Sequence, residues 1–238
     1  MGAWRMRSVV AVASAIACMV LACSSASKPG FSPPANDGGG DDGSATSSSS
    51  SSSSSSGSDV PGYPPGPYGS SPGFTLNDFS ASGYRLGPGQ TDSTKLPWTT
   101  IDVAEYHESS VCKCLLVTVG ATWCGGCMAE QPMLVQAHAQ DPSFCVMGIL
   151  QADLGTNGMQ ENASKADVDA WTQMYEQNFY VVQGSDETMY ALVDGHGNGS
   201  VGLPFSLIVK PSTMKVVGQI AGVNLNAHDY AMSLCAAQ

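Results

Sequence analysis

Two cysteines separated by two residues, Cys124 and Cys127, are the part of this sequence whose residue types and spacing most directly indicate chemistry. An apolar, β-branched run at 114–119 precedes them, and a helix is expected to begin at Cys124. Amide groups at a helix N-terminus stabilise negative charge, so Cys124 is placed to act as an attacking thiolate. One turn later, Cys127 could attack the resulting mixed disulfide and release the substrate. The pair therefore predicts thiol–disulfide exchange, with Cys124 as nucleophile and Cys127 as resolving thiol.

The segments around this pair predict an α/β domain. Strands at 114–119 and 144–150 flank a helix at 124–139, and because a helix connects them the two strands should be parallel. Strands at 205–209 and 214–221 should form an antiparallel hairpin around a proline turn. The other expected elements are short strand or strand-edge segments at 74–76 and 101–103, a helix capped by Ser164, a strand at 179–182, and helices at 188–193 and 226–236.

The residues on either side of the pair resemble the thioredoxin superfamily. Trp123 precedes the nucleophile, while Glu130 and Pro132 follow the second cysteine, and the string 123–132 looks most like the membrane-anchored TlpA/ResA-like branch of redoxins. The resemblance extends from Phe74 to the C-terminal helix. It implies a thioredoxin-like fold with four or five central strands in a mixed sheet flanked by helices, an N-terminal extension and an insertion around 155–177.

The resemblance also implies roles for residues outside the pair. Thioredoxin-like folds place a cis-proline opposite the dithiol, and Pro204 fits that position, so the Leu203 backbone would bind an incoming extended chain. Trp123 would contact the same substrate. Thioredoxins carry a buried carboxylate six residues before the first cysteine, where this sequence has Thr118. Glu130 is the substitute, and it would take the proton from the resolving thiol.

Four more cysteines lie in the predicted domain. Six cysteines in an exported domain imply an oxidising compartment, so we expect structural disulfides among the remaining four. The sequence leaves their pairing open, and buried free thiols or a second redox relay are alternatives. No second pair of matching Cys or His accompanies the dithiol, so neither a metal site nor a cofactor is expected. The candidates for structural bridging are Cys112, Cys114, Cys145 and Cys235.

The N-terminus predicts export and lipid attachment. Two arginines precede an apolar, uncharged run at 9–21 that is too short to span a bilayer comfortably. The residues ending at Cys23 resemble a bacterial lipobox, which makes 1–22 a signal peptide and Cys23 the acylated anchor. Ordinary secretion and anchoring at Cys18 are alternatives. Ser24 follows the anchor, and by resemblance to lipoprotein sorting this favours the outer membrane.

A segment rich in Ser, Gly, Pro and Asp follows the predicted anchor. It includes an unbroken serine tract at 47–56 and cannot bury enough apolar surface to offset chain entropy. We therefore predict a disordered tether at 23–73 and a thioredoxin-like domain at 74–238.

Charge and family resemblance together define the expected function. The formal net charge of −11 excludes a nucleic-acid partner, whose phosphates require a basic surface. The prediction is a monomeric thiol:disulfide oxidoreductase of the bacterial cell envelope, outside the cytoplasm, acting as a reductant on exported protein thiols and disulfides and served by an unknown redox donor. Reducing thioredoxins have Gly-Pro where this sequence has Gly125 and Gly126, which leaves a disulfide oxidase or isomerase as an alternative. A non-enzymatic surface-binding protein on the same scaffold is the other alternative.

Overall fold

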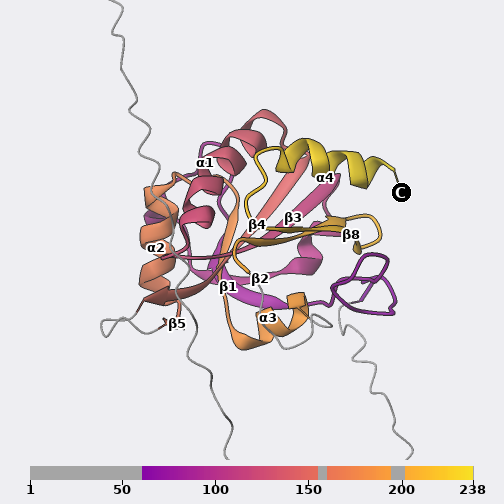
Figure 1. Ribbon diagram of the computed structural model, residues 1–238, viewed down its shortest axis with the longest axis horizontal. Coiled ribbons are helices and arrows are strands. Elements are labelled where there is room, and N and C mark those ends of the chain that lie inside the picture. The colour runs from indigo at the N-terminus through magenta and orange to yellow at the C-terminus, as the bar shows by residue number, and fades with distance from the viewer. Residues whose placement is uncertain (1–60, 155–159, 194–201, 238) are drawn as a thin grey trace, which may run out of the picture. The chain divides into compact units, whose positions relative to one another are not determined.

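The computed structural model describes residues 61–154, 160–193 and 202–237 (Figure 1). The predicted signal peptide, Cys23 and the tether up to residue 60 lie outside these ranges. Among the described residues, no helix combines the length and apolar character needed to cross a bilayer.

Within the described ranges, eight strands form one mixed sheet in the order β2-β1-β6-β4-β3-β7-β8, with β5 paired to β4 beside this path. β3 lies at the centre, parallel to β4 and antiparallel to β7, and β4 is also parallel to β6. The bounds are β1 (Ser80–Tyr84), β2 (Thr99–Asp102), β3 (Cys114–Ala121), β4 (Phe144–Leu154), β5 (Gln160–Asn162), β6 (Tyr180–Gln183), β7 (Phe205–Lys210) and β8 (Lys215–Ala221).

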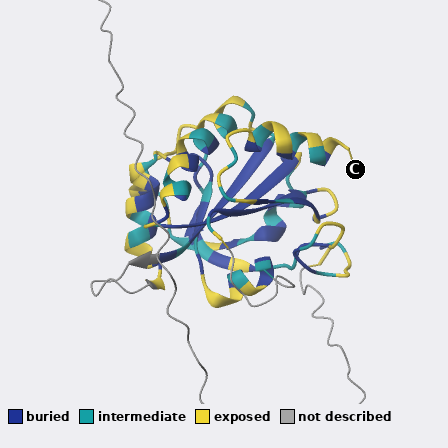
Figure 2. Cartoon of the chain, in the orientation of Figure 1, coloured by how far each residue is buried: buried dark blue, intermediate teal, exposed yellow. Residues whose placement is uncertain are grey.

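Helices cover both faces of the sheet, and β3 is consequently buried along its whole length (Figure 2). Leu115, Val117 and Val119 face a core that includes α3, whereas Leu116 faces a core built from α1, α2 and α4. The helices are α1 (Gly125–Gln140), α2 (Lys165–Met174), α3 (Asp186–Val193) and α4 (Ala227–Ala236), with short 3₁₀ turns at Ser93–Lys95 and Val103–Tyr106.

The predicted mixed α/β architecture is confirmed. The parallel β3-α1-β4 unit, the β7-β8 hairpin and the Ser164-capped helix all form where the sequence places them. The expectation of four or five strands is too low, because β1 and β2 extend the sheet beyond β6. β1 is built mostly of small residues, and a Cβ at Gly83 would lie only 2.1 Å from the Val181 carbonyl oxygen. Pairing with β6 therefore requires a glycine, which weakens the strand signal in the sequence.

Residues 61–73, which the sequence assigns to the tether, pack on the domain. Tyr63 is buried, and its hydroxyl donates a hydrogen bond to the Leu76 carbonyl oxygen at 2.9 Å. The Thr75 hydroxyl donates to the Pro65 carbonyl oxygen at 3.0 Å, and Tyr68 forms an isolated β-bridge with Thr75. The tyrosines supply apolar area that the serine tract lacks. The ordered domain thus includes residues from Pro61 onward. Thr75 also forms an isolated bridge with Lys215 of β8, so 74–76 lies at the edge of the sheet, which is one of the two forms predicted for it.

Two disulfides tie the N-terminal end of β3 to its neighbours. Cys112 is bonded to Cys145 at the start of β4, and Cys114 is bonded to Cys235 in the last turn of α4. The Cα atoms of each pair are 5.7 Å apart. The structure therefore gives the pairing that the sequence leaves open, and it attaches the C-terminal helix to the central strand.

Replacing Tyr63 tests whether 61–73 belongs to the folded domain. Tyr63→Ala should lower the free energy of unfolding by about 2 to 4 kcal/mol, because a buried ring and its hydrogen bond are lost. Tyr190→Ala is the matched control, since Tyr190 is 79% exposed on α3 and its loss should change stability by less than about 0.5 kcal/mol. Urea denaturation measures both. Equal effects of the two substitutions would show that the segment is not packed as described.

Candidate active site

Cys124 lies at the junction between β3 and α1. Its N–H donates to the Ala121 carbonyl oxygen at 3.1 Å, and its sulfur accepts a hydrogen bond from the Cys127 N–H at 3.0 Å. Cys124 is thus the N-cap of α1, and it is joined to Cys127 by a disulfide with a Cα separation of 5.2 Å. In the reduced protein the same amide would stabilise a Cys124 thiolate. This geometry is the one that a sulfur nucleophile needs.

The two sulfurs of this disulfide differ in access. Cys124 is 7% exposed, whereas Cys127 is fully buried. Cys127 packs against β3 at Gly120, where an added Cβ would lie 3.3 Å from the Cys127 Cβ and 3.5 Å from its sulfur. A molecule from solvent can therefore reach Cys124 but not Cys127. Sequence reasoning missed Gly120; its signal is a glycine inside an otherwise apolar strand.

Pro204 lies on the other side of the first turn of α1. The Leu203–Pro204 peptide is cis, and an added Cβ at Gly126 would lie 3.1 Å from Pro204 Cδ. A side chain at position 126 would therefore displace Pro204. The second glycine of the Gly-Gly dipeptide thus allows the helix and the 203–204 segment to approach closely.

Exposed apolar side chains border the reachable sulfur. Trp123, next to Cys124, is 40% exposed. Val223 is also exposed, and its Cγ2 would lie 3.0 Å from a Cβ at Gly126. The Gly222 N–H donates to the Pro204 carbonyl oxygen at 2.8 Å, which fixes Val223 beside Pro204. Sequence reasoning did not identify Val223, because it follows β8 and reaches Gly126 only through the tertiary fold.

Glu130 is buried one helical turn after Cys127, on the same face of α1. The Thr118 hydroxyl of β3 donates to Glu130 Oε2 at 3.4 Å, and Oε1 has no hydrogen-bond partner among the described residues. Burial raises the pKa of Glu130 to about 7, and the Thr118 hydrogen bond opposes part of this rise. A carboxyl group with this pKa can both release and accept a proton near neutral pH. The structure thus places Glu130 against the Thr118 position, as the sequence comparison with thioredoxins implies.

A chain of buried amides supports the first turn of α1. Gln131 Nε2 donates to the Cys127 carbonyl oxygen at 3.4 Å, and Gln177 Nε2 donates to Gln131 Oε1 at 2.5 Å. Both glutamines are buried. They connect the backbone of the resolving cysteine to the segment between α2 and β6. No local sequence signal identifies this pair.

The remaining cysteines do not join the site. Cys112 and Cys114 are at the opposite end of β3, and the eight residues of that strand separate them from Cys124 by roughly 25 Å. Cys23 lies outside the described residues. Among the residues that the structure describes, no group of three or more His, Cys, Asp or Glu side chains could hold a metal ion.

Comparison with known proteins gives similarity at the level of solved structures. No protein-family model matches the chain, and no curated protein matches it. The thioredoxin domain of a thiol-disulfide oxidoreductase from Bacteroides vulgatus is 12% identical, with a TM-score of 0.48 over 69% of this chain and 98% of that one. A putative thiol:disulfide interchange protein DsbE from Chlorobium tepidum is 16% identical, with a TM-score of 0.47 over 69% of this chain and 97% of that one.

A further similar structure is a secreted disulfide oxidoreductase from Mycobacterium tuberculosis, described as homologous to DsbE of E. coli. It is 17% identical to this chain, with a TM-score of 0.42, and the match covers 66% of this chain and 95% of that one.

The raised pKa of Glu130 predicts a pH-dependent stability. Between its ordinary value of 4.5 and about 7, the folded state keeps a proton that the unfolded state has lost. The free energy of unfolding should therefore fall as pH rises through this range, by on the order of 3 kcal/mol. Glu130→Gln should remove this fall, because an amide does not titrate there. Urea denaturation of the oxidised proteins from pH 4 to about 8 measures the difference.

Thr118→Val provides a second variant. It removes the hydrogen bond that lowers the Glu130 pKa, so its fall in stability should continue to higher pH than in the wild type. Identical pH profiles for the wild type and Glu130→Gln would contradict the assignment.

Proposed function

We propose that the chain is a thiol:disulfide oxidoreductase that exchanges disulfides with exported proteins through Cys124 and Cys127. The observation that carries this proposal is the asymmetric disulfide at the start of α1. One sulfur is reachable and hydrogen-bonded by a helix amide, and its partner is enclosed behind it. A purely structural bridge does not require this division between a sulfur open to attack and a sulfur protected from it.

Exchange at this site has two steps, written here for reduction of a substrate. The Cys124 thiolate attacks one sulfur of the substrate disulfide, that bond breaks, and the other substrate sulfur leaves as a thiolate. Cys127 then loses its proton and attacks the Cys124 sulfur of the mixed disulfide. The second substrate thiolate leaves, the Cys124–Cys127 disulfide forms, and two electrons have passed to the substrate.

Glu130 is assigned the proton transfer in the second step. Cys127 is closed off from solvent, so its proton needs an internal acceptor. The Glu130 carboxyl is buried on the same helix face, and its raised pKa suits it to accept a proton from a thiol near neutral pH. Thr118 holds one carboxyl oxygen and leaves the other available.

An extended polypeptide is the substrate that best fits the border of the site. Trp123 and Val223 offer apolar surface beside Cys124. The Leu203 backbone precedes Pro204 and would offer hydrogen bonds to a chain lying across the disulfide, as in strand addition. Backbone recognition of this kind accepts many sequences, which suits an enzyme that acts on several exported proteins.

We assign the physiological direction as reduction and the location as the bacterial cell envelope, with the domain attached through an acylated Cys23. The direction is supported by the resemblance of residues 123–132 to the TlpA/ResA-like branch, and the location by the lipobox-like N-terminus. A reductant in an oxidising compartment must be reduced again after each turnover, so a separate dithiol donor is part of the proposal.

Serine substitutions of the two cysteines test the activity. The wild-type protein should accelerate the reduction of insulin by dithiothreitol. Cys124→Ser should return this reaction to the uncatalysed rate, because the attacking sulfur is lost. Cys127→Ser should accumulate mixed disulfides on Cys124, because the second step is blocked. Non-reducing electrophoresis and mass spectrometry detect the trapped species. The double variant Cys124→Ser/Cys127→Ser is the control and should trap nothing; catalysis by Cys124→Ser at the wild-type rate would exclude the proposed function.

A further inference from the structure

Exposed apolar side chains extend beyond the border of the candidate active site. Among the described residues, eight large apolar side chains are exposed, and three of them are Trp123, Val223 and Leu225. Trp123 precedes Cys124, and Leu225, which is 72% exposed, follows Val223 by two residues. Exposed apolar side chains that gather on one surface mark a binding site more often than scattered ones do. The apolar border of the site therefore continues from Val223 toward Leu225.

The segment at 222–228 runs along one face of α1. At one end, Val223 Cγ2 would lie 3.0 Å from a Cβ at Gly126, in the first turn of the helix. At the other end, His228 Nε2 lies 3.2 Å from Oδ2 of Asp141, the C-cap residue of the helix. Positions 133, 137 and 140 follow Gly126 by about two, three and four turns, so they share its face. The face of α1 that meets Val223 therefore continues to the end of the helix.

A hollow of about 210 Å³ lies between this face and the segment, and we call it the α1 hollow. Met133, Ala137 and Leu225 form its apolar walls, while Asp141 and His228 line its far end. A cavity of about 150 Å³ can hold a benzene ring, so the α1 hollow has room for one large apolar side chain. A stable interface between two folded chains buries roughly 1,200 Å² or more, which a hollow for one side chain does not supply. A side chain of an extended polypeptide therefore fits it better than a second copy of this protein.

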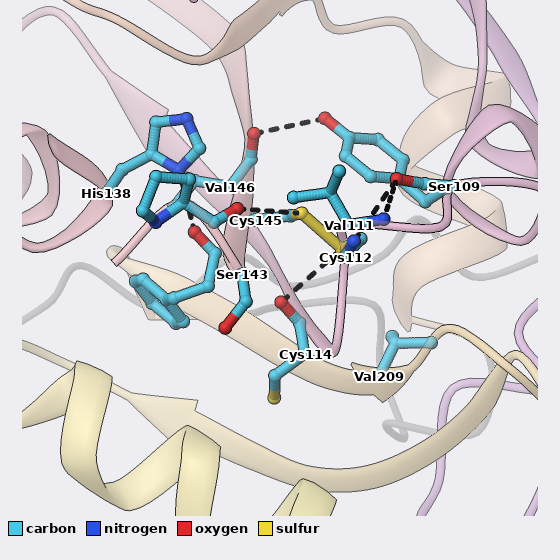
Figure 3. Close-up of a disulfide and its surroundings, with 12 residues drawn as sticks. Ser109, Val111, Cys112, Cys114, His138, Ser143, Cys145, Val146 and Val209 are labelled. Carbon is cyan, nitrogen blue, oxygen red and sulfur yellow. Dashed lines mark hydrogen bonds between the residues drawn. A yellow bond between two sulfur atoms is a disulfide. The ribbon is translucent and has the colours of Figure 1, made fainter. Parts of the chain in front are cut away.

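Contacts at the end of α1 hold the far wall of the α1 hollow in place. The Ser143 N–H and hydroxyl both donate to Asp141 Oδ1, at 3.0 and 2.7 Å. His138, in the last turn of α1, is hydrogen-bonded to the first residue of β4, next to the Cys112–Cys145 disulfide (Figure 3). The hollow is therefore preformed, as binding sites usually are.

The helix sets the distance from Cys124 to the α1 hollow. Met133 is nine residues after Cys124, which is about 14 Å along α1 at a rise of about 1.5 Å per residue. An extended chain advances about 3.3 Å per residue, so this distance corresponds to roughly four residues. Side chains four residues apart in an extended chain point to the same side, so both can face the protein. A chain whose cysteine is bonded to Cys124 can thus place a side chain about four residues away in the hollow.

We propose that the α1 hollow is a specificity subsite for extended polypeptides with a large apolar side chain about four residues from the cysteine that Cys124 attacks. This inference rests on the proposed thiol–disulfide exchange and names the kind of segment that the site prefers. The bonds that form and break are those of the first exchange step. Burial of the apolar side chain stabilises the complex in which Cys124 attacks, so it raises the rate of attack at low substrate concentration.

The test uses the full chain carrying Cys127→Ser, in which Cys124 can attack and the mixed disulfide stays trapped. Each substrate is a short Gly/Ser peptide with a central cysteine, activated as its mixed disulfide with 5-thio-2-nitrobenzoate, and with a single leucine at a chosen position. Attack on the peptide sulfur releases the coloured thionitrobenzoate anion, whose absorbance gives the second-order rate constant. The rate measured with Cys124→Ser/Cys127→Ser is subtracted, because it reports all other thiols.

The position of the leucine should determine the rate. We expect leucine four residues from the cysteine, on one side of it, to give a rate constant about tenfold above that of serine at the same position. Leucine three or five residues away points to the opposite side of an extended chain, so it should react at nearly the serine rate.

Substitutions in the α1 hollow test where the leucine binds. Leu225→Ser should lower the tenfold ratio to about threefold or less, and Ala137→Phe, which fills the hollow, should lower it to about one. Met174→Ser is the matched control, because Met174 is an apolar side chain of similar exposure, 69%, on α2. It should keep the tenfold ratio. Far-UV circular dichroism checks that each variant is folded, and Leu225→Ser replaces an exposed side chain that folding does not require.

Cross-linking locates the bound side chain directly. Photo-leucine at the preferred position of the trapped peptide should cross-link to Met133 or Leu225, which peptide mass spectrometry identifies. Cross-links found only outside the α1 hollow would overturn the proposal. Sedimentation of the free protein tests the other occupant, because a dimer that Leu225→Ser dissociates would show that a second copy fills the hollow, and this would also overturn it.

The failure of this inference can be told apart from the failure of the proposed function. Equal rates for leucine and serine at every position, or a preference that Leu225→Ser and Ala137→Phe leave unchanged, would overturn the subsite and leave the exchange reaction intact. A Cys127→Ser protein that reacts no faster than Cys124→Ser/Cys127→Ser with any peptide would overturn both.

Discussion

Close packing between Cys127 and the end of β3 is the constraint on which the rest of the site depends. Gly120 leaves room for the Cys127 side chain, so the first turn of α1 lies directly over the strand. This position encloses Cys127 and leaves Cys124 at the N-cap, where the Cys127 amide points at its sulfur. A larger side chain at position 120 would separate helix and strand. It would also expose the sulfur whose protection defines the order of the two exchange steps.

The rest of the domain holds this junction from several sides. β3 is buried on both faces, and the Cys114–Cys235 bridge fixes its far end to α4. Pro204 packs against Gly126 on the opposite side of the first turn of α1. The Gln131 amide donates to the backbone of this turn, and the Gln177 amide donates to Gln131. The same close packing buries Glu130, which disfavours its charged form and raises the pKa of its carboxyl group to about 7. That destabilising burial is also what makes the group suitable for proton transfer, which is typical of functional sites.

Local sequence patterns were sufficient for the centre of the fold. The apolar run of β3, the Cys-x-x-Cys spacing and the Ser164 cap each depend on neighbouring residues, and all three elements form as predicted. Features that depend on distant contacts were not accessible in this way. β1 consists of small residues and exists because Gly83 fits against β6, while Tyr63 is ordered by contact with Leu76. The disulfide pairing and the place of Val223 beside Gly126 likewise follow from tertiary structure.

The central claim is that Cys124 is the sulfur open to attack and Cys127 is the protected one. Brief alkylation of the reduced, folded protein with iodoacetamide, followed by peptide mass spectrometry, measures this most directly. The structure predicts that Cys124 is modified first and that Cys127 is modified at a comparable rate only after denaturation, because one side chain reaches solvent and the other does not. Modification of Cys127 as fast as Cys124 in the folded protein would contradict the account.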